Sequence, residues 1–169
     1  GENSWTGCYA EQVLRRSEHL LPLPDNATFA EGAAIGIPYG TAYRAIVQCA
    51  SAKVGECMLV HGASGAVGTA ALQLAKSLNL STIGTAGSTR GLELIRQQGA
   101  DHVLDHTQSG YLNAVAELTN GSGPDIILEM LANVNLASDI DIAAPFCRIV
   151  IIGSRGSVEI NPRQTMMKD

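Results

Sequence analysis

The glycine-rich segment at residues 62–68 carries the clearest chemical signal in this 169-residue sequence. It reads Gly-Ala-Ser-Gly-Ala-Val-Gly, which fits the pattern G-x-G-x-x-G when aligned on its last two glycines, with Ala63 in the first position. Such a turn lets the backbone approach a pyrophosphate at Gly65 and lets a helix pack closely on a strand at Gly68. The N-terminus of the following helix presents free N–H groups to the phosphates. The segment therefore predicts a dinucleotide site.

The segment at residues 85–90 bears on which dinucleotide this turn would hold. NAD sites place an Asp or Glu about 20 residues after the turn, where it binds the ribose 2′-hydroxyl. Residues 85–90 read Thr-Ala-Gly-Ser-Thr-Arg and contain no acid. No carboxylate there would repel a 2′-phosphate, while Ser88 and Arg90 offer a hydroxyl donor and a positive charge. The sequence therefore favours NADPH, with Ser88 and Arg90 among its contacts.

Other nucleotide sites and metal sites lack their signatures. No Gly-Lys-Ser/Thr closes the turn as in a P-loop, and no tyrosine has a lysine four residues later as in short-chain reductases. A methyltransferase would also require an acid after the second strand. The four histidines and four cysteines show no metal-ligand spacing, so we expect no metal site. His61 stands on an apolar run, where we expect a hydrogen-bonded core histidine.

The composition describes an acidic domain with a sizeable core. The 11 basic and 16 acidic residues leave a net charge of −5, which argues against a general nucleic-acid binder. Hydrophobic residues make up 46% of the chain and charged residues 16%. No apolar stretch approaches the roughly 18 residues of a membrane span. The cysteines form no C-x-x-C pair and no export signal opens the sequence, so we expect free thiols, no membrane and a cytoplasmic location.

Short apolar runs alternate with helical patterns along the chain. The runs predict strands at residues 57–61, 81–85, 102–104, 125–129 and 148–152. Apolar residues follow helix spacing from Val67 to Leu78, and shorter patterns predict helices around residues 92–99, 112–118 and 136–144. This alternation implies right-handed crossovers and a parallel sheet covered on both faces. The fold class is therefore α/β, a Rossmann-type doubly wound sheet with about five of its usual six strands.

The residues before the sheet form a separate part of the sequence. Residues 1–25 are predicted as strand and loop. Thr28 and Glu31 then fit a capping box, in which a hydroxyl and a carboxylate satisfy amides at a helix start. Helical segments are expected from there to about Ser51. We divide the chain into residues 1–25 and a nucleotide-binding domain at residues 26–169.

Several motifs are similar to those of one known family. They are the segments at residues 32–39, 60–68, 84–87, 129–136, 153–156 and 160–163. In these segments the chain resembles the zeta-crystallin family of NADPH-dependent quinone reductases, a branch of the medium-chain dehydrogenase/reductase superfamily. The resemblance implies that residues 1–25 are the tail of a GroES-like catalytic domain and that the Rossmann domain is truncated on its C-terminal side.

The same resemblance implies a set of cofactor contacts. The pyrophosphate side comprises Ser64, Gly65, Ala66, Val67 and Gly68. The adenosine side comprises Gly87 and His106. The nicotinamide side comprises Asn135, Ile152, Gly153, Ser154 and Arg155. Two positions depart from the family pattern, because Ala66 replaces a usual Gly and Gly40 replaces a Phe. Gly40 could alter the substrate side of the cleft.

The resemblance also implies an activity, which is hydride transfer from NADPH to a quinone of the ortho type, without zinc. A quinone needs little help from a general acid, so we assign no catalytic side chain. The family implies a homotetramer, and we expect the isolated segment to turn over poorly. The alternative is a crystallin-like structural or RNA-binding role, which the family also includes. The charge of −5 weighs against RNA binding, and a titration with AU-rich RNA at two salt concentrations would separate the two.

Overall fold

The computed structural model describes residues 10–168, which divide into two compact units, one up to Ala33 and one from Ala34. The described part of the first unit holds the short 3-10 helix η1 (Ser17–His19) and the start of α1 (Phe29–Tyr43). The strand predicted before residue 25 is not found among residues 10–25. These residues are mostly exposed, and no described strand pairs with them, so their backbone lacks the partners a strand requires. Residues 1–9 lie outside the described part.

The start of α1 follows the predicted capping box. The Glu31 backbone N–H donates to Thr28 Oγ1 at 3.2 Å, and the Thr28 N–H donates to Glu31 Oε2 at 2.7 Å. These two bonds satisfy N–H groups that the first helical turn leaves without partners. The helix α1 continues into η2 (Arg44–Cys49), so the expected helical stretch to about Ser51 is confirmed.

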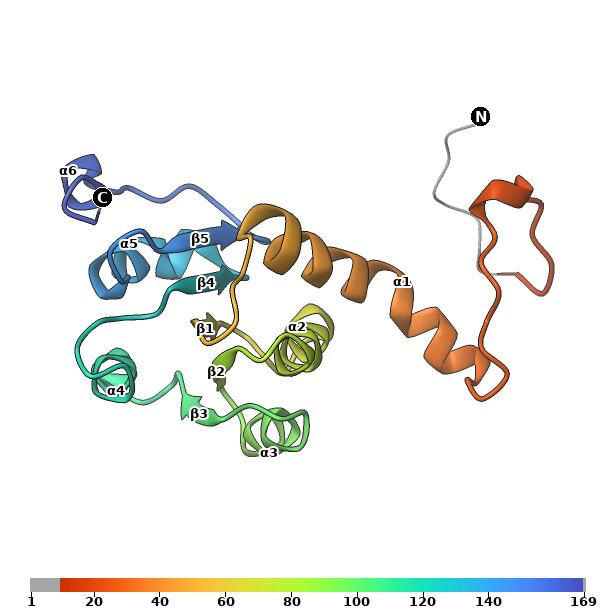
Figure 1. Ribbon diagram of the computed structural model, residues 1–169, viewed down its shortest axis with the longest axis horizontal. Helices are drawn as coiled ribbons and strands as arrows, with labels where there is room; N and C mark the ends of the chain where they lie inside the picture. The colour runs from red at the N-terminus through yellow and green to blue at the C-terminus, as the bar shows by residue number, and fades with distance from the viewer. Residues whose placement is uncertain (1–9, 169) are drawn as a thin grey trace. The chain divides into compact units, whose positions relative to one another are not determined.

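The second unit is built on a five-stranded parallel sheet (Figure 1). Its strands are β1 (Cys57–Val60), β2 (Ser81–Ala86), β3 (His102–Asp105), β4 (Ile126–Glu129) and β5 (Arg148–Ile151). They lie side by side in the order β3-β2-β1-β4-β5. All five predicted strands are confirmed, each with one end shifted by one residue. The predicted doubly wound α/β class is therefore confirmed.

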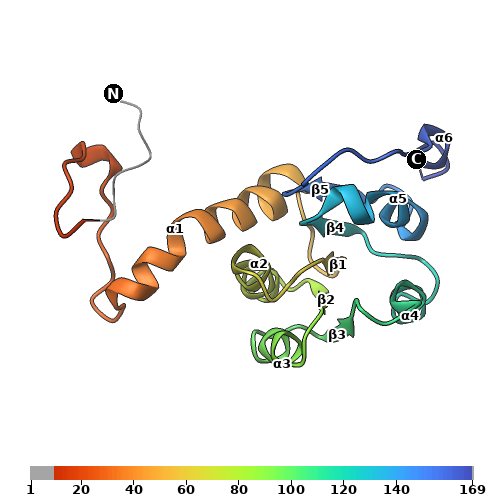
Figure 2. The ribbon, with the colours of Figure 1, turned by 180° about the vertical axis from the view of Figure 1, so that it is seen from behind.

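Helices cover both faces of this sheet. Helices α2 (Ala66–Ser77) and α3 (Thr89–Gln97) lie on one side, and α4 (Tyr111–Leu118) and α5 (Ala132–Ile142) lie on the other (Figures 1 and 2). A short α6 (Pro162–Thr165) follows the sheet. The predicted start of α5 at residue 136 is wrong, because the helix already begins at Ala132. Polar Asn133 and Asn135 occupy its first turn and interrupt the apolar period that the prediction relied on.

Alternate residues of the central strands face the two helical layers. On β1, Met58 and Val60 belong to the core under α2 and α3, whereas Leu59 packs with Ile83 and Val115 on the other side. All of these side chains are buried. This alternation is what a parallel sheet with both faces covered requires, because successive side chains point to opposite faces.

None of the helices among the described residues is long and apolar enough to span a membrane.

Three cysteines of the described residues, Cys49, Cys57 and Cys147, are free thiols. Burial raises the pKa of the Cys57 thiol to about 11 and that of Cys147 to about 12. Both of these half-buried thiols therefore stay protonated near neutral pH and act as small apolar residues.

Candidate functional site

The carboxyl ends of the five strands meet at one edge of the sheet, and every predicted cofactor segment lies there. In the strand order, β1 has β2 on one side and β4 on the other, so the chain reverses its direction of winding between β1 and β4. The glycine turn follows β1, Gly87 follows β2 and His106 follows β3. Ser88 and Arg90 also follow β2, and the remaining predicted contacts follow β4 and β5. Open α/β sheets bind ligands at this kind of reversal.

The glycine turn brings α2 unusually close to the end of β1. A Cβ atom on Gly68 would lie 2.5 Å from Ala63 Cα and 2.7 Å from its carbonyl carbon, so only glycine fits. Gly62 has a φ of +56°, in the left-handed region that favours glycine. Gly65 is the N-cap of α2 and supplies no capping side chain. The first N–H groups of α2 therefore point outward behind an exposed glycine, which suits an anion.

Thr85, at the end of β2, holds this turn in place. Its carbonyl accepts a hydrogen bond from the Ala63 N–H at 2.8 Å, and its Oγ1 accepts one from the Gly62 N–H at 3.3 Å. The side chain is fully buried. Thr85 is not among the predicted site residues, although a hydroxyl at the end of an apolar strand beside a glycine turn is a usable signal.

Gly87 and His106 are neighbours across the ends of β2 and β3. A Cβ atom on Gly87 would lie 2.5 Å from His106 Nε2, so the imidazole occupies the space a side chain would need. The His106 N–H donates to the Ala86 carbonyl at 3.1 Å, and its Nδ1 lies 3.3 Å from Thr85 Oγ1. The turn and the predicted adenosine side therefore share Thr85 as a support.

Ser88 and Arg90 stand at the start of α3. Ser88 is the N-cap, and its Oγ accepts a hydrogen bond from the Gly91 N–H at 3.1 Å. Because the oxygen serves as the cap, the hydroxyl hydrogen is the part left to donate to a phosphate. Arg90 is exposed in the first turn, and within residues 10–168 it has no hydrogen bond or ion pair. Its guanidinium is therefore free to reach a ligand.

The segments after β4 and β5 are tied to each other. The Ile152 N–H donates to the Glu129 carbonyl at 2.8 Å, and a Cβ atom on Gly153 would lie 2.5 Å from the Met130 carbonyl oxygen. The Arg155 N–H donates to Asn133 Oδ1 at 2.8 Å. The Ser154 hydroxyl donates within its own loop, and the Arg155 side chain is exposed. The structure thus places the five predicted nicotinamide-side residues on two connected segments.

A buried cluster of three titratable side chains lies behind these segments. His61 Nε2 is 2.8 Å from Asp139 Oδ1 and 3.7 Å from Glu129 Oε2, and all three side chains are buried. Burial, followed by the neighbouring Asp139 carboxyl group, raises the pKa of Glu129 to about 7. His61 is the expected core histidine, whereas neither carboxylate is among the predicted site residues. A glutamate that ends a buried apolar strand was the available signal.

The residues present at the carboxyl edge fit a dinucleotide. The uncapped N-terminus of α2 supplies donors for a pyrophosphate, and its helix dipole favours negative charge. Gly65 is exposed and carries no side chain that would cover these donors. Residues 85–90 contribute one guanidinium and no carboxylate. This donor set can bind phosphates and contains no group that would repel them.

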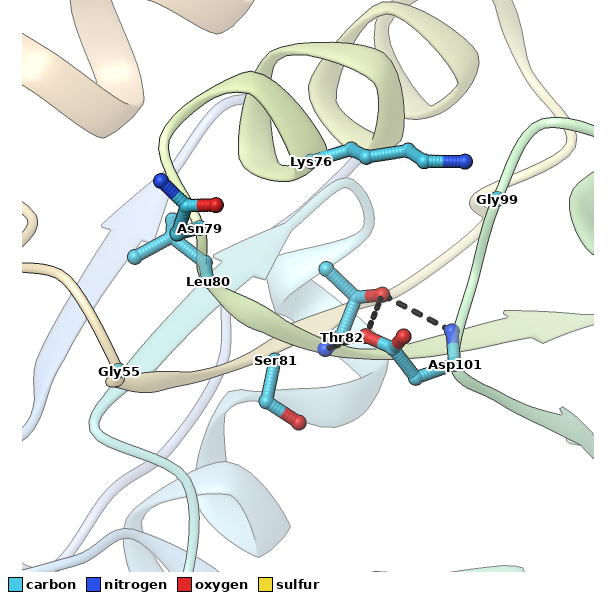
Figure 3. A pocket seen from close by; sticks show the side chains of 8 residues that line it. All are labelled: Gly55, Lys76, Asn79, Leu80, Ser81, Thr82, Gly99 and Asp101. Carbon is cyan, nitrogen blue, oxygen red and sulfur yellow. Dashed lines mark hydrogen bonds between the residues drawn. The ribbon is translucent and has the colours of Figure 1, made fainter.

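The opposite edge of the sheet carries a separate cavity of about 400 Å³ (Figure 3). It is lined by Gly55, Lys76, Asn79, Leu80, Ser81, Thr82, Gly99 and Asp101. There the Asp101 carboxylate accepts hydrogen bonds from the Thr82 N–H and hydroxyl at 2.8 and 2.9 Å (Figure 3). Thr82 and Asp101 therefore satisfy each other's hydrogen-bonding groups. None of the predicted cofactor residues lies in this cavity.

Comparison with known proteins gives consistent matches. A family described as zinc-binding dehydrogenase matches residues 66–169. Human quinone oxidoreductase is 46% identical over 97% of this chain and 50% of its own length. The quinone oxidoreductase of Thermus thermophilus, whose structures include a complex with NADPH, is 30% identical with a TM-score of 0.77, over 88% of this chain and 47% of its own. An NAD-dependent alcohol dehydrogenase is 30% identical with a TM-score of 0.90, over 96% and 48%.

These matches confirm the resemblance to quinone oxidoreductases and cover nearly all of this chain. The chain spans about half the length of the relatives it matches. The family match covers the glycine-turn helix and every element after it. This chain belongs to the zinc-binding dehydrogenase family of the medium-chain dehydrogenase/reductase superfamily, with quinone oxidoreductases among its relatives.

Proposed function

We propose that this chain is the cofactor-binding part of an NADPH-dependent quinone reductase. One observation carries the proposal: an uncapped helix N-terminus stands behind a glycine turn at the edge where all five strands end. The relatives support it, since the human one is named quinone oxidoreductase and the one from Thermus thermophilus was solved with NADPH.

In this proposal the side chains and backbone groups bind and orient the cofactor. The α2 N-terminus and the turn hold the pyrophosphate through Ser64, Gly65, Ala66, Val67 and Gly68. Gly87, Ser88, Arg90 and His106 take the adenosine side. Asn135, Ile152, Gly153, Ser154 and Arg155 take the nicotinamide side. NADPH, when bound, supplies a hydride from C4 to the quinone, and the protein contributes position and exclusion of water.

The preference for NADPH over NADH rests on Arg90. Its guanidinium is exposed and unpaired among the described residues, and residues 85–90 hold no acid. The relatives include both an NADPH complex and an NAD-dependent enzyme, so the family alone leaves this choice open. We expect NADPH to bind at least ~10-fold more tightly than NADH, which is about 1.4 kcal/mol.

Isothermal titration calorimetry of this chain with each cofactor tests the proposal. Replacing Arg90 by Met should bring the two affinities to within about threefold of each other by weakening NADPH. Arg96→Met is the matched control, because Arg96 is exposed at the other end of α3 and pairs with Glu93 at 3.3 Å. Equal affinities in the unmodified chain would refute the role of Arg90. No binding of either cofactor would refute the function.

The quinone substrate and the absence of zinc are parts of the same proposal. A quinone accepts a hydride readily, so the site needs neither a proton-donating side chain nor a Lewis acid. The isolated chain should turn over slowly, and we expect its slow NADPH-dependent reduction of an ortho-quinone to survive dialysis against a chelator. A loss of this rate that zinc restores would contradict the proposal. We also propose a homotetramer, which light scattering would test, and a cytoplasmic location, which the free thiols suit.

A further inference from the structure

Three titratable side chains from separate elements meet inside the second unit, behind the segments that follow β4 and β5. His61 directly follows β1, Glu129 is the last residue of β4 and Asp139 lies in α5. One nitrogen or oxygen atom of each lies within 4.8 Å of those of the other two. The exposed fractions are 3% for His61 and 0% for both acids, so water does not screen this cluster.

Each of the two carboxyl groups has one oxygen with donors and one without. Glu129 Oε1 accepts hydrogen bonds from the Leu131 N–H and from Asn135 Nδ2. Asp139 Oδ1 is paired with His61 Nε2 at 2.8 Å. The remaining oxygens, Glu129 Oε2 and Asp139 Oδ2, are buried and accept no hydrogen bond from any described group. Two ionised carboxylates with bare oxygens in a dry interior would cost several kcal/mol.

We propose that a proton is shared between Glu129 and Asp139, so that Glu129 is a neutral carboxylic acid whose carbonyl oxygen orients Asn135. Glu129 Oε2–H then donates to Asp139 Oδ2, and Asp139 Oδ1 keeps its contact with His61 Nε2. Every polar atom of both acids has a partner in this arrangement. Like-charged carboxyl groups in close proximity share one proton in the same way elsewhere.

The surrounding charges place the proton on Glu129. Asp139 Oδ1 is already paired with His61 Nε2, whereas the paired oxygen of Glu129 faces only neutral amides. The effects of burial and of Asp139 hold the pKa of Glu129 near 7. Tyr111 is the remaining titratable group at the cluster, with its ring edge-on to His61 at 6.4 Å. Burial and then the charges of Asp139 and Glu129 raise its pKa to about 12, so it stays neutral.

The consequence for Asn135 follows from the direction of its hydrogen bond. Asn135 Nδ2 donates to Glu129 Oε1 at 3.2 Å, and the flipped amide would set oxygen against oxygen. The Oδ1 atom of Asn135 is therefore kept as an acceptor away from Glu129. This step rests on the proposed function, in which Asn135 lies on the nicotinamide side and an acceptor suits the N–H groups of a carboxamide. Glu129 acts through Asn135 and is a positioning residue.

The same three side chains could instead ligate a divalent cation, and their spacing argues for the proton. Two ligands of one tetrahedral zinc ion, each at about 2.0–2.2 Å, stand about 3.3 Å apart. His61 Nε2 and Asp139 Oδ1 are 2.8 Å apart, which is an ordinary hydrogen-bond length. The two atoms are therefore spaced as a hydrogen bond and are closer together than two ligands of one tetrahedral zinc ion.

Two isosteric variants test the shared proton directly. Glu129→Gln keeps the carbonyl that Leu131 and Asn135 use and replaces the acid O–H with an N–H donor to Asp139. Asp139→Asn supplies its own donor to Glu129, which then no longer needs the proton. We expect infrared difference spectra of the 169-residue chain to show a buried protonated carboxyl band at mildly acidic pH. The band should disappear in both variants, and a wild-type spectrum without it would overturn the proposal.

Cofactor affinity tests the positioning role. Glu129→Gln should bind NADPH within about twofold of the wild type, whereas Glu129→Met, which lacks the acceptor for Asn135, should bind at least ~10-fold more weakly. Equal loss in the Gln and Met variants would overturn the neutral-acid assignment. Tight zinc binding to the metal-free chain that Glu129→Gln abolishes would also overturn it. If the wild type binds no NADPH, the proposed function fails, while the infrared band still decides where the proton lies.

Discussion

The two edges of the parallel sheet differ in whether side chains of the protein satisfy the backbone polar groups there. At the amino edge, carboxylates accept hydrogen bonds from backbone N–H groups near the starts of the strands. Asp125 accepts from the Cys57 N–H at 2.8 Å, and Asp101 accepts from the Thr82 N–H. At the carboxyl edge, the turn after β1 ends in an uncapped helix and an exposed Gly65. One edge is closed by the protein itself, and the other leaves donors for a ligand.

Because of this difference, we expect the amino edge to contribute to folding stability and the carboxyl edge to contribute to cofactor binding. Backbone groups that side chains satisfy contribute to folding, whereas donors left free at a helix N-terminus are satisfied by water or by a ligand. A change at the amino edge should therefore alter the free energy of unfolding and leave cofactor affinity unchanged. A change at the carboxyl edge should alter affinity, and it should alter stability as well where the group that changes is buried.

The largest effect is expected at Gly68, where the carboxyl edge is also tightly packed. Gly68→Val would drive a side chain into the Ala63 backbone, since even a Cβ atom would lie 2.5 Å from its Cα. We expect a loss of at least about 3 kcal/mol in the free energy of unfolding, measured with urea. Gly40→Ala is the control, because its Cβ meets nothing within 4 Å and should change stability by no more than about 1 kcal/mol. Wild-type stability of Gly68→Val would refute the close approach of helix and strand.

The next effect depends on pH and on the buried acid Glu129. Its pKa rises from 4.5 to about 7 on folding, so between these values the folded state holds a proton that the unfolded state releases. The free energy of unfolding should therefore fall as the pH rises through this window, by on the order of 3 kcal/mol in total. His61, Asp139 and Tyr111 face the same group and remain in the control, Glu129→Gln. The free energy of unfolding of the wild type minus that of Glu129→Gln, measured with urea, should fall as the pH rises from 4.5 to about 7. A difference that stays constant with pH would contradict the prediction.

Arg148 lies at the amino edge, so replacing it should lower the stability of the fold without changing cofactor affinity. Its guanidinium donates to the Ala50 carbonyl at 2.9 Å and the Asp125 carbonyl at 3.1 Å, and it pairs with Glu56 at 2.6 Å. Arg148→Met should cost about 2 kcal/mol, because three partly buried acceptors each lose one charged donor, although the Asp125 carbonyl keeps the residue 148 backbone N–H and Glu56 keeps the Lys53 N–H. Calorimetry should find unchanged NADPH affinity for the folded variant.

The control for Arg148 is an ion pair of the same chemistry on the surface. Arg96 and Glu93 are both more than half exposed, so Arg96→Met should change stability by less than about 0.5 kcal/mol. Similar losses in Arg148→Met and Arg96→Met would show that the amino edge is not closed by Arg148.

The smallest expected effect is a difference in NADPH affinity between variants of two threonines in β2. Thr82 and Thr85 are both buried in β2, but Thr82 bonds Asp101 at the amino edge and Thr85 bonds the Gly62 N–H at the carboxyl edge. Replacing either by Val should cost about 1 kcal/mol of stability. Only Thr85→Val should also weaken NADPH binding, by about threefold. Equal affinities in the two variants, measured by calorimetry, would remove the distinction between the edges at this strand.

Features with a local cause could be predicted from the sequence. The strands follow from apolar runs, and the capping box follows from Thr28 and Glu31, because a hydroxyl and a carboxylate three residues apart suffice to close it. The glycine turn could also be predicted, since close packing and a positive φ exclude side chains at fixed spacing. Predictions failed where no local pattern exists, as at the start of α5 and in the strand expected before residue 25.

The sequence by itself determined that a parallel sheet would bring glycines, hydroxyls and one guanidinium to a single edge. Only the tertiary structure decided what lies beneath that edge. His61, Glu129 and Asp139 are far apart in the chain, and they meet because β1 pairs with β4 and α5 folds back over the sheet. Whether a buried acid is charged depends on its neighbours and its distance from water, and neither is encoded in local spacing.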